Sequence, residues 1–478
     1  MNKYLLLLII CLPFCAQAQT PPAGKFTIQQ CVDYAVKNNI TVKQADVQKA
    51  LSEINKWEAN GANIPTLGGT IGVGYNRGLS QNPSTGILQV NDFISGQIGV
   101  SSNYTLLTWG ARKNNIAAAS LDVEAANASL DKARNDISLA VANAFLQAML
   151  NNENINIAKV QLDQSLAQLK NTDALVKAGS VPDLNSVQLQ AQVARDSANY
   201  IQAQATYRQS VINIKALLTI PQTQPFDIVI PPVEAIHIEN ILELDPANVY
   251  ATGQTNQPLQ RINGLRIQQA QKTAASSRAA MFPQVYLQAN LNTRYAGIDY
   301  PGGATLLPGF DTSFNFIDVG GTPYPVLSPR YNIKYAKQPV LDQFNDNFGQ
   351  YIGVGISFNI FNQRQFRSQY KRAKTQITQY TLQQQQDNIT LESDIYNAYE
   401  QARAALEKYN ASLRNVSASQ KALDYSKKRY DVGLLGILDY IITQNNLLTA
   451  KIQAVSNQYD YVFKMKVLEF YKGQGLKF

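Results

Sequence analysis

A 478-residue chain with 45% hydrophobic and 16% charged residues is long enough for two or three domains. Its mean hydropathy of −0.21, together with the lack of any apolar run of ~18 residues, excludes a bundle of membrane helices. The net charge of +8 is dispersed within helical patterns, which argues against a nucleic-acid-binding surface.

The N-terminus has the pattern of a secretory signal peptide over residues 1–18. Asn2-Lys3 forms the positively charged region, and residues 4–14 form the apolar core. Ala16-Gln17-Ala18 matches the small-x-small pattern of a cleavage site. We therefore expect an exported protein whose mature chain begins near Gln19.

Three cysteines occur in the sequence, and Cys11 and Cys15 both lie in this signal peptide. A lipid anchor on Cys15 is disfavoured, because the bulky Phe14 occupies a position where lipidation needs a small residue. Cleavage leaves Cys31 alone, within an apolar pattern of helical spacing. We expect a buried structural thiol there, in a protein that is stabilised by packing without an intramolecular disulfide.

The mature chain contains two copies of one unit. Residues 178–185 correspond to 432–439 and residues 104–113 to 358–367, both at an offset of 254, whereas residues 62–65 correspond to 280–283 at an offset of 218. The difference of 36 residues indicates an insertion in the second copy. The resulting organisation is a first repeat over 19–219, a Pro-rich linker over 220–245 and a second repeat over 246–478.

Each repeat shows the order helix, strand, strand, long helix, turn, helix. The first has a predicted helix over 28–60, strands at about 67–76 and 94–106, and helices over 111–176 and 185–218. The second has a helix over 246–279, strands at about 285–295 and 351–361, helices over 364–430 and 437–471, and a long extracellular loop at about 297–346. The long helices lack internal Gly and Pro, which favours coiled-coil packing, and the longest would reach roughly 100 Å.

The four strands alternate between apolar and polar residues. In the third strand, Val285, Leu287 and Ala289 share one face, whereas Gln288 and Asn290 share the other. Such strands match those of a membrane β-barrel, and the alternative is a half-buried soluble sheet packed on the helices. Four strands cannot close, and open edges in lipid leave backbone groups unpaired. A membrane location therefore requires an oligomer, in which two copies give eight strands with a filled interior and three give twelve with a lumen.

These residues together resemble the TolC family of outer membrane efflux proteins. The resemblance covers essentially the whole mature chain and is carried by the opening helix at 27–39, the two strand pairs, Trp109-Gly110-Ala111-Arg112 and the duplicated Gly-centred turns. It implies a mixed fold, a transmembrane β-barrel with four strands per chain and twelve in a homotrimer, which continues into a long periplasmic α-helical coiled-coil barrel. The linker would belong to the equatorial region of that barrel.

The resemblance also implies a function. The chain would be the trimeric outer membrane channel, passive and gated at its periplasmic tip, through which a tripartite efflux or secretion system exports its substrates. Its partners would be a periplasmic adaptor protein, an inner-membrane pump and outer membrane lipid, without nucleic acid and without a cofactor. Neither the transported substrate nor the particular adaptor and pump follows from the residues.

The two helix-hairpin tips are implied to contact the adaptor. The Val-Gly-Leu motif of the family is complete in Val432-Gly433-Leu434, whereas Ala178-Gly179-Ser180 in the first repeat matches only at Gly179. The contacts of Ser180 and its neighbours therefore depart from the family pattern. Both glycines are also explained by turn geometry alone, because glycine tolerates positive φ.

A periplasmic gate is implied near the second tip. Tyr430 and Asp439 resemble the tyrosine before the turn and the first aspartate after it. The position of a second aspartate is Ile442, that of a locking arginine is Leu435, and the first repeat has Asn185 opposite Asp439. Three copies of Asp439 around one axis would attract cations. The alternative role of Asp439 is to complement the dipole of the helix that it begins.

Two other classes of function compete with a channel. An enzyme is disfavoured, because the single histidine, His237, lies in the linker without metal-ligand spacing and no nucleophile, Walker or dinucleotide motif is present. We therefore expect no catalytic residue and no metal site. A soluble periplasmic coiled-coil adaptor or structural protein would explain the helices and the signal peptide, but not four amphipathic strands in matched pairs.

Overall fold

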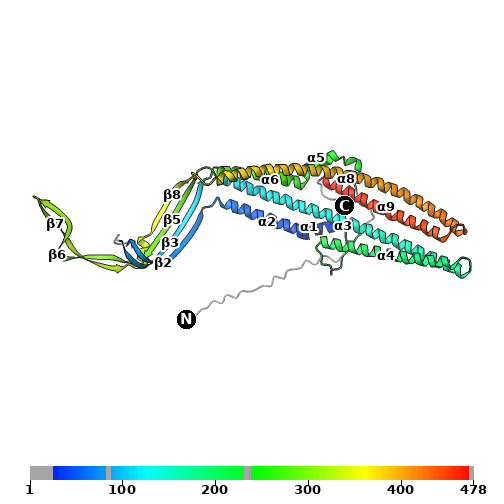
Figure 1. Cartoon of the computed structure of the whole chain (residues 1–478), viewed down its shortest axis with the longest axis horizontal. Helices are drawn as coiled ribbons and strands as arrows, with labels where there is room; N and C mark the ends of the chain where they lie inside the picture. Colours follow the sequence, from blue (N-terminus) through cyan, green and yellow to red (C-terminus); the bar gives the residue numbers. More distant parts are fainter. Residues whose placement is uncertain (1–24, 82–87, 231–235, 237, 473–478) are drawn as a thin grey trace, which may run out of the picture. The chain divides into compact units, whose positions relative to one another are not determined.

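The computed structural model describes residues 25–81, 88–230, 236 and 238–472. The signal peptide and His237 lie outside these residues. The chain divides into two compact units, a mainly helical unit of Met1–Ile54, Ser120–Gln269 and Ile377–Phe478, and a second unit of Asn55–Ala119 and Ala270–Gln376 that holds the long strands (Figure 1). Among the described residues, no helix is long and apolar enough to cross a bilayer.

The helices occur in pairs of equal length, one from each repeat. The pairs are α1 (Ile28–Asn38) and α5 (Pro246–Asn256) with 11 residues, α2 (Ile40–Gly61) and α6 (Pro258–Ala279) with 22, α3 (Ala111–Lys177) and α8 (Gln365–Asp431) with 67, and α4 (Asp183–Leu217) and α9 (Ile437–Tyr471) with 35. This pairing confirms the internal duplication. At 1.5 Å per residue, α3 and α8 are each about 100 Å long.

Each repeat begins with two helices where the sequence predicts one, so the continuous helices expected over 28–60 and 246–279 are wrong. The chain breaks at Asn39 and at Gln257, 218 residues apart. The side chain of Asn39 donates to the carbonyl of Leu217 (2.8 Å), and that of Gln257 donates to Phe470 (3.0 Å) and Tyr471 (3.2 Å). Each break therefore caps carbonyl groups that the last turn of α4 or α9 leaves without a helical partner.

Each repeat also has its own hydrophobic core, at corresponding positions. Val141 of α3 is equivalent to Ile395 of α8, and Ile214 of α4 is equivalent to Leu468 of α9, all four fully buried. Cys31 of α1 lies in the first core. Burial raises the pKa of its thiol to about 12, which agrees with a structural role.

The linker is tied to the N-terminal segment by a short parallel pair, β1 (Lys25–Phe26) with β4 (Asp227–Ile228). Phe26 and Ile228 are buried in the first core. A 3₁₀ turn, η2 (Ile241–Glu243), then leads into α5. The described part of the linker thus packs against the helices, with Ile220, Ile228 and Ile236 in the first core and Ile241 and Leu244 in the second.

In the second unit, four antiparallel strands form one sheet in the order β2 (Thr66–Gln81), β3 (Leu88–Leu107), β5 (Gln284–Ala296) and β8 (Gly349–Ser357). The register aligns the alternation across the sheet. Ile71 pairs with Ile98, and Leu287 pairs with both Tyr104 and Val354. Because paired residues share a face, apolar side chains gather on one side of the sheet and Gln, Asn, Ser and Gly on the other.

The Trp109-Gly110-Ala111-Arg112 motif forms the corner between β3 and α3. Trp109 and Gly110 both adopt positive φ, +51° and +85°. The Trp109 indole N–H donates to the carbonyl of Pro283, just before β5. The Arg112 guanidinium donates to the Tyr104 hydroxyl (3.1 Å) and to the carbonyl of Thr105, and it lies over the Tyr104 ring. The motif thus fixes where two strands join their helices.

Three strand-level predictions are wrong. The first strand pair is longer than expected, because pairing continues to Gln81 of β2 and Leu88 of β3, beyond the predicted limits at 76 and 94. The fourth strand ends at Ser357 and not near 361, because its partner β5 begins at Gln284, immediately after Pro283, which has no N–H to extend the ladder. The segment expected to be a loop over 297–346 is a long hairpin of β6 (Asp299–Val319) and β7 (Thr322–Lys337), followed by the short helix α7 (Val340–Asp346). Its Gly and Pro residues suggested a loop, but they occupy the turn, bulges and strand edges.

Candidate functional site: helix tips, gate residues and helix seams

Both tips end their long helices in the same way. Gly179 and Gly433 have φ of +68° and +77°. The N–H of Ser180 donates to the carbonyl of Leu175 (2.9 Å), and that of Leu434 donates to Arg429 (2.8 Å). This 6→1 bond, closed over a left-handed glycine, is the Schellman termination of a helix. The turn therefore requires both glycines, whatever else the tips contact.

The two tips differ in the side chains that they expose. Val432 and Leu434 at the second tip are 68% and 70% exposed. The equivalent residues of the first tip, Ala178 and Ser180, are also exposed but are small or polar. At the two positions that flank the turn glycine, only the second tip thus presents bulky apolar side chains to solvent, and these positions belong to the complete Val-Gly-Leu motif. The next exposed leucine is present at both tips, as Leu184 and Leu438.

The predicted gate residues lie on the two sides of the second tip. Tyr430, in the last turn of α8, is half-buried and its ring stacks on that of Tyr440 in α9, with centroids 5.2 Å apart. Burial, with smaller contributions from Asp431 and Tyr430, raises the pKa of Tyr440. Tyr440 was not predicted as part of this site. The sequence feature that could have identified Tyr440 is its place in a helical pattern of spacings three and four on α9, whose buried members are Ile437, Tyr440, Ile441 and Gln444.

Asp439 is exposed in the first turn of α9. The N-cap of that helix, Gly436, offers no side chain to its free N–H groups, so the carboxylate of Asp439 is placed to complement the helix dipole. Its backbone carbonyl accepts a hydrogen bond from Thr443 (2.8 Å), whose hydroxyl also lies 3.3 Å from that of Ser426 in α8. Within one chain, the Tyr430 ring contacts Tyr440, which directly follows Asp439 in the sequence.

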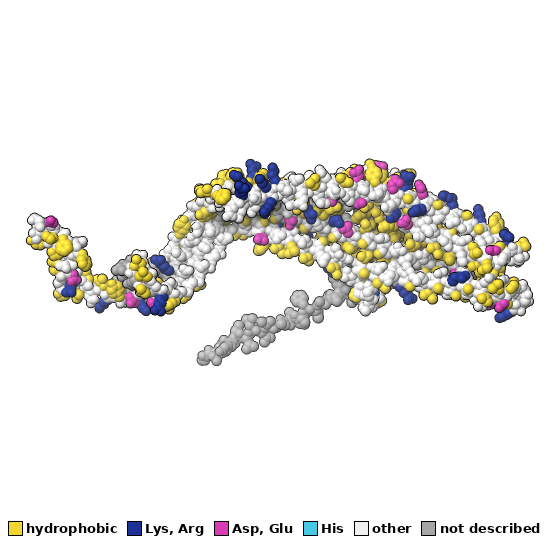
Figure 2. All heavy atoms as spheres, in the orientation of Figure 1, with side chains coloured by type: hydrophobic (Ala, Val, Ile, Leu, Met, Phe, Trp, Pro, Cys, Tyr) yellow, Lys and Arg dark blue, Asp and Glu magenta, His cyan; other side chains and the backbone are white. Residues whose placement is uncertain are grey.

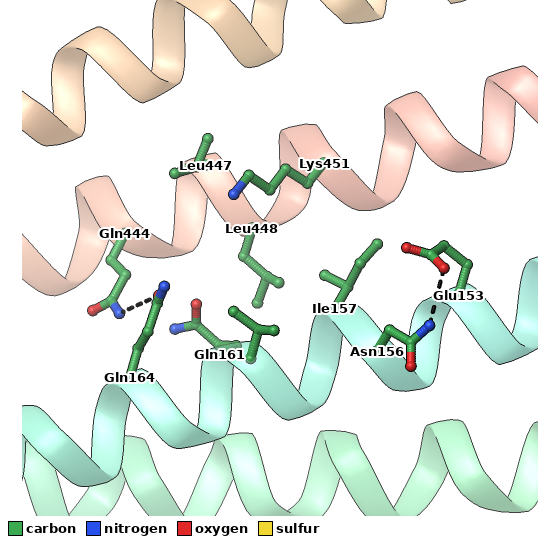
Figure 3. A pocket seen from close by; sticks show the side chains of 10 residues that line it. Glu153, Asn156, Ile157, Gln161, Gln164, Gln444, Leu447, Leu448 and Lys451 are labelled. Atoms are coloured by element: carbon green, nitrogen blue, oxygen red, sulfur yellow. Dashed lines mark hydrogen bonds between the residues drawn. The ribbon is translucent and has the colours of Figure 1, made fainter.

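Grooves with mixed polar and apolar lining run between the helices near the tips. One of about 160 Å³ lies between α3 and α9; Figure 3 shows the side chains that line it, with Gln444 donating to Gln164 (3.3 Å). A second groove of about 400 Å³ lies between α3, α4 and α9 and shares Gln161 and Leu448 with the first. The described residues include no cluster of His, Cys, Asp and Glu that could hold a metal ion.

Two helices expose apolar stripes that no helix of the same chain covers in the described structure. On α2, Ile40, Val47, Leu51 and Ile54 recur at spacings of three, four and seven, and each is about half exposed or more. On α8, Leu382, Ile389 and Tyr396 recur every seven residues and are similarly exposed. Such spacing is typical of coiled-coil seams. Sequence reasoning missed these stripes, although their periodicity is visible in the sequence.

The chain matches the family model described as outer membrane efflux protein over residues 33–219 and 319–473. Outer membrane efflux protein BepC of Brucella suis is 22% identical over 444 residues, which are 90% of this chain and 81% of the relative. The pyoverdine export outer membrane protein OpmQ of Pseudomonas aeruginosa is 23% identical over 403 residues, which are 82% of this chain and 73% of the relative.

The fold is similar to that of solved channel structures. The chain superposes on CusC, whose crystal structures concern folding and transmembrane channel formation, with a TM-score of 0.76 over 96% of both chains and 14% identity. At this identity the likeness concerns the fold alone. It agrees with the order of strands and helices expected from the sequence.

Proposed function

The chain belongs to the outer membrane efflux protein family, and on this premise we propose that it is the exit duct of a tripartite efflux or secretion system. Three copies form a passive channel in the outer membrane, and their helical parts extend into the periplasm. A periplasmic adaptor and an inner-membrane pump supply substrate and energy. A gate at the helix tips, with Tyr430 and Asp439, controls opening, and the chain itself catalyses no reaction.

The amphipathic four-stranded sheet carries this proposal. One of its faces is apolar, as in strands that contact lipid, and the other is polar, as in strands that line water. Among the described residues no strand pairs with the outer edges of β2 and β8, and in lipid each unpaired backbone group would cost several kcal/mol. Further copies can close the sheet edge to edge, and three copies provide twelve strands.

The helical unit supports the same assembly. The edge strands β2 and β8 lead into α2 and α8, the two helices with exposed apolar stripes. When β8 of one copy pairs with β2 of the next, α8 and α2 of those copies become neighbours. At ~1.5 Å per residue, the stripes overlap where Ile40 and Leu382 lie at similar distances from the strands, and there they can pack as part of a seam between copies.

Purified outer membranes test the proposal. We expect a trimer on native gels and discrete conductance steps when that trimer is added to planar lipid bilayers. A monomer in the soluble periplasmic fraction would contradict the duct and would favour the alternative, a soluble periplasmic adaptor or structural protein.

We further propose that the second tip, Val432-Gly433-Leu434, is the main docking site for the adaptor, and that Gly179 and Ser180 of the first tip contribute less. Leu434→Asp places a charge in the exposed apolar patch without changing the turn glycine. Export in cells should fall at least ~10-fold, because burying an unpaired charge in an interface costs several kcal/mol. Ser180→Asp, the equivalent change at the polar tip, is the matched control.

The amount of trimer in each variant distinguishes a loss of adaptor docking from a loss of folding or assembly. Both variants should form trimers at wild-type levels, because both positions are exposed beyond the helix ends. If Leu434→Asp exports normally, or if Ser180→Asp impairs export equally, the second tip does not have the assigned role.

A further inference from the structure

The hairpin of β6 and β7 is the largest feature that the duct does not explain. Its strands of 21 and 16 residues pair with each other, and at ~3.3 Å per residue β7 is about 50 Å long. Asp318 accepts a hydrogen bond from the N–H of Gly321 (2.8 Å) and closes the Gly320-Gly321 turn. A ribbon of only two strands is marginally stable in water unless one face is covered.

One face of this hairpin is mostly apolar; its polar members are Thr312, the register partner of Leu327, and Asp318 at the turn. It is formed by Ala304, Leu306 and Phe310 of β6 and by Leu327, Pro329, Tyr331, Ile333 and Tyr335 of β7; we call it the apolar hairpin face. Leu306 and its register partner Tyr331 are 67% and 56% exposed. Hydrophobic side chains are visible along these strands in Figure 2.

Away from the turn, where the register pair Ile317 and Tyr324 is apolar, the opposite face is polar and has its own cross-strand contacts. Arg330 pairs with Asp311 at 3.0 Å, and Thr305 and Asn332 are register partners. Apolar and polar residues are thus largely separated between the two faces of the hairpin. Because exposure of the apolar hairpin face to water is unfavourable, we expect another surface to cover it. The polar face suits contact with water.

The outer edge of β7 is blocked by prolines, which favours contact through the apolar hairpin face. Pro323, Pro325 and Pro329 stand at positions of the same parity, each opposite a residue of β6. Because proline has no N–H to donate, it is tolerated where the N–H would point away from the partner strand. The outer edge therefore lacks three donors and resists the addition of a strand.

Charge distinguishes between a lipid and a protein as the cover. The hairpin contains three acidic residues (Asp299, Asp311 and Asp318) and three basic ones (Arg330, Lys334 and Lys337). An element that lies on an anionic membrane surface is expected to carry excess positive charge. The balance here favours a protein surface.

Position favours a second copy of this chain as that protein. The hairpin is inserted between β5 and β8, so it leaves the sheet beside β8, the edge at which the next copy joins in the proposed trimer. Copies held in one assembly meet at effective concentrations on the order of millimolar or more. With a length of about 50 Å, each hairpin can reach its equivalents across the mouth of the duct.

We propose that the three hairpins of a trimer pack together through the apolar hairpin face and form a cover over the outer mouth of the duct. The inference rests on the proposed trimeric channel. This cover would be a second barrier, at the end of the duct opposite the periplasmic tips, and would restrict the entry of large molecules from outside. The polar faces, with the Arg330–Asp311 pairs, point to solvent.

Cysteine cross-linking in purified trimers tests the contact. In a Cys31→Ser background, Tyr331→Cys lies on the apolar hairpin face, and the adjacent Asn332→Cys lies on the polar face of the same strand. We expect oxidation to link Tyr331→Cys chains into covalent dimers at least ~10-fold faster than Asn332→Cys chains. Native gels of the same samples report whether trimers are present.

The outcomes are separable. Absence of trimers would overturn the proposed function, whereas intact trimers with equal or absent cross-linking would overturn the cover alone. A fluorophore attached to Tyr331→Cys can also be studied in nanodiscs that contain brominated lipids. Quenching by these lipids would show that the face contacts lipid and would overturn the proposed cover. In intact cells, linkage of Tyr331→Cys mainly to a protein of a different mass would do the same.

Permeability tests the barrier. Replacing the register pair Leu306 and Tyr331 by Ser should loosen the cover and make cells at least ~4-fold more sensitive to a large antibiotic that normally cannot cross the outer membrane. Replacing the polar register pair Thr305 and Asn332 by Ser is the matched control and should leave sensitivity unchanged. Equal sensitivity of the two variants, at equal trimer levels, would contradict the barrier.

Discussion

Cys31 shows how burial alone determines the chemistry of a side chain. The thiol is fully buried in the first core, and its pKa rises from 9.0 to about 12. Well below pH 9 the thiol is protonated in both the folded and the unfolded chain, so it contributes no pH dependence there. Between pH 9 and 12 the unfolded thiol ionises first, and the folded state loses stability as pH rises.

We predict that the native trimer resists alkylation at Cys31. At pH 9 only about 0.1% of a thiol with this pKa is thiolate, the reactive form. Iodoacetamide should label the native protein at least ~100-fold more slowly than the same protein in denaturant, as measured by mass spectrometry. Comparable rates in both conditions would show that Cys31 is accessible.

Asp439 is the residue for which two roles compete, a charge at the gate and a complement to the helix dipole. Asp439→Asn removes the charge in either case, and Asp183→Asn removes the first-turn charge of α4, which lies two positions earlier in its helix because the equivalent of Asp439 is Asn185. Each substitution should cost a similar ~0.3–1 kcal/mol of helix stabilisation.

We predict that only Asp439→Asn changes conduction. Three fewer negative charges at the constriction should lower the preference for cations over anions severalfold, measured as a shift in reversal potential across planar bilayers under a salt gradient. An unchanged reversal potential would leave Asp439 with the dipole role alone. A shift of similar size in Asp183→Asn would place the filter at both tips.

At the scale of elements, the helix breaks at Asn39 and Gln257 join separate helices into continuous stacks. Each amide side chain bridges from the start of one helix to the last carbonyls of another. Both side chains are buried, so water cannot replace them without rearrangement. The duplicated geometry argues that this cap is part of the fold in both repeats.

We predict that Gln257→Leu destabilises the protein by about 1–3 kcal/mol, because the carbonyls of Phe470 and Tyr471 lose a buried donor. The loss should appear as a lower midpoint in denaturant unfolding of the purified protein. Gln254→Leu is the control, since Gln254 is exposed on the same helix and donates to Tyr250. Equal midpoints for the two variants would show that the cap contributes little.

At the scale of the whole molecule, the sheet must present its apolar face to lipid and its polar face to water. Leu287 and Gln288 are neighbours on β5 and lie on opposite faces. We predict that Leu287→Arg reduces the yield of outer membrane trimers, because an arginine facing the middle of a bilayer costs about 2–4 kcal/mol in a barrel.

Gln288→Arg places the same charge on the polar face and should assemble normally while it changes ion selectivity. Trimer yield in outer membrane fractions and reversal potentials in planar bilayers report the two effects. Normal assembly of Leu287→Arg, or failure of Gln288→Arg, would mean that the faces are assigned the wrong way round.

The duplication, the long helices and the tip turns could be predicted from the sequence because they depend on local patterns. Uninterrupted helical periodicity determined α3 and α8 to within a residue or two at each end, and Gly179 and Gly433 marked turns that require positive φ. The alternation in the four strands likewise indicated their two faces, since side chains on a strand alternate with a period of two.

The tertiary structure decided what depends on partners distant in the chain. Tyr440 stacks on Tyr430 across the tip, Asn39 caps a helix that ends 178 residues later, and the segment at 297–346 forms a hairpin because its strands find each other in register. A backbone group takes whichever hydrogen-bond partner the fold brings to it, and no local pattern records that partner. The low charged fraction of 16% is likewise explained only by the tertiary structure, in which the sheet separates an apolar surface from a mostly uncharged polar one.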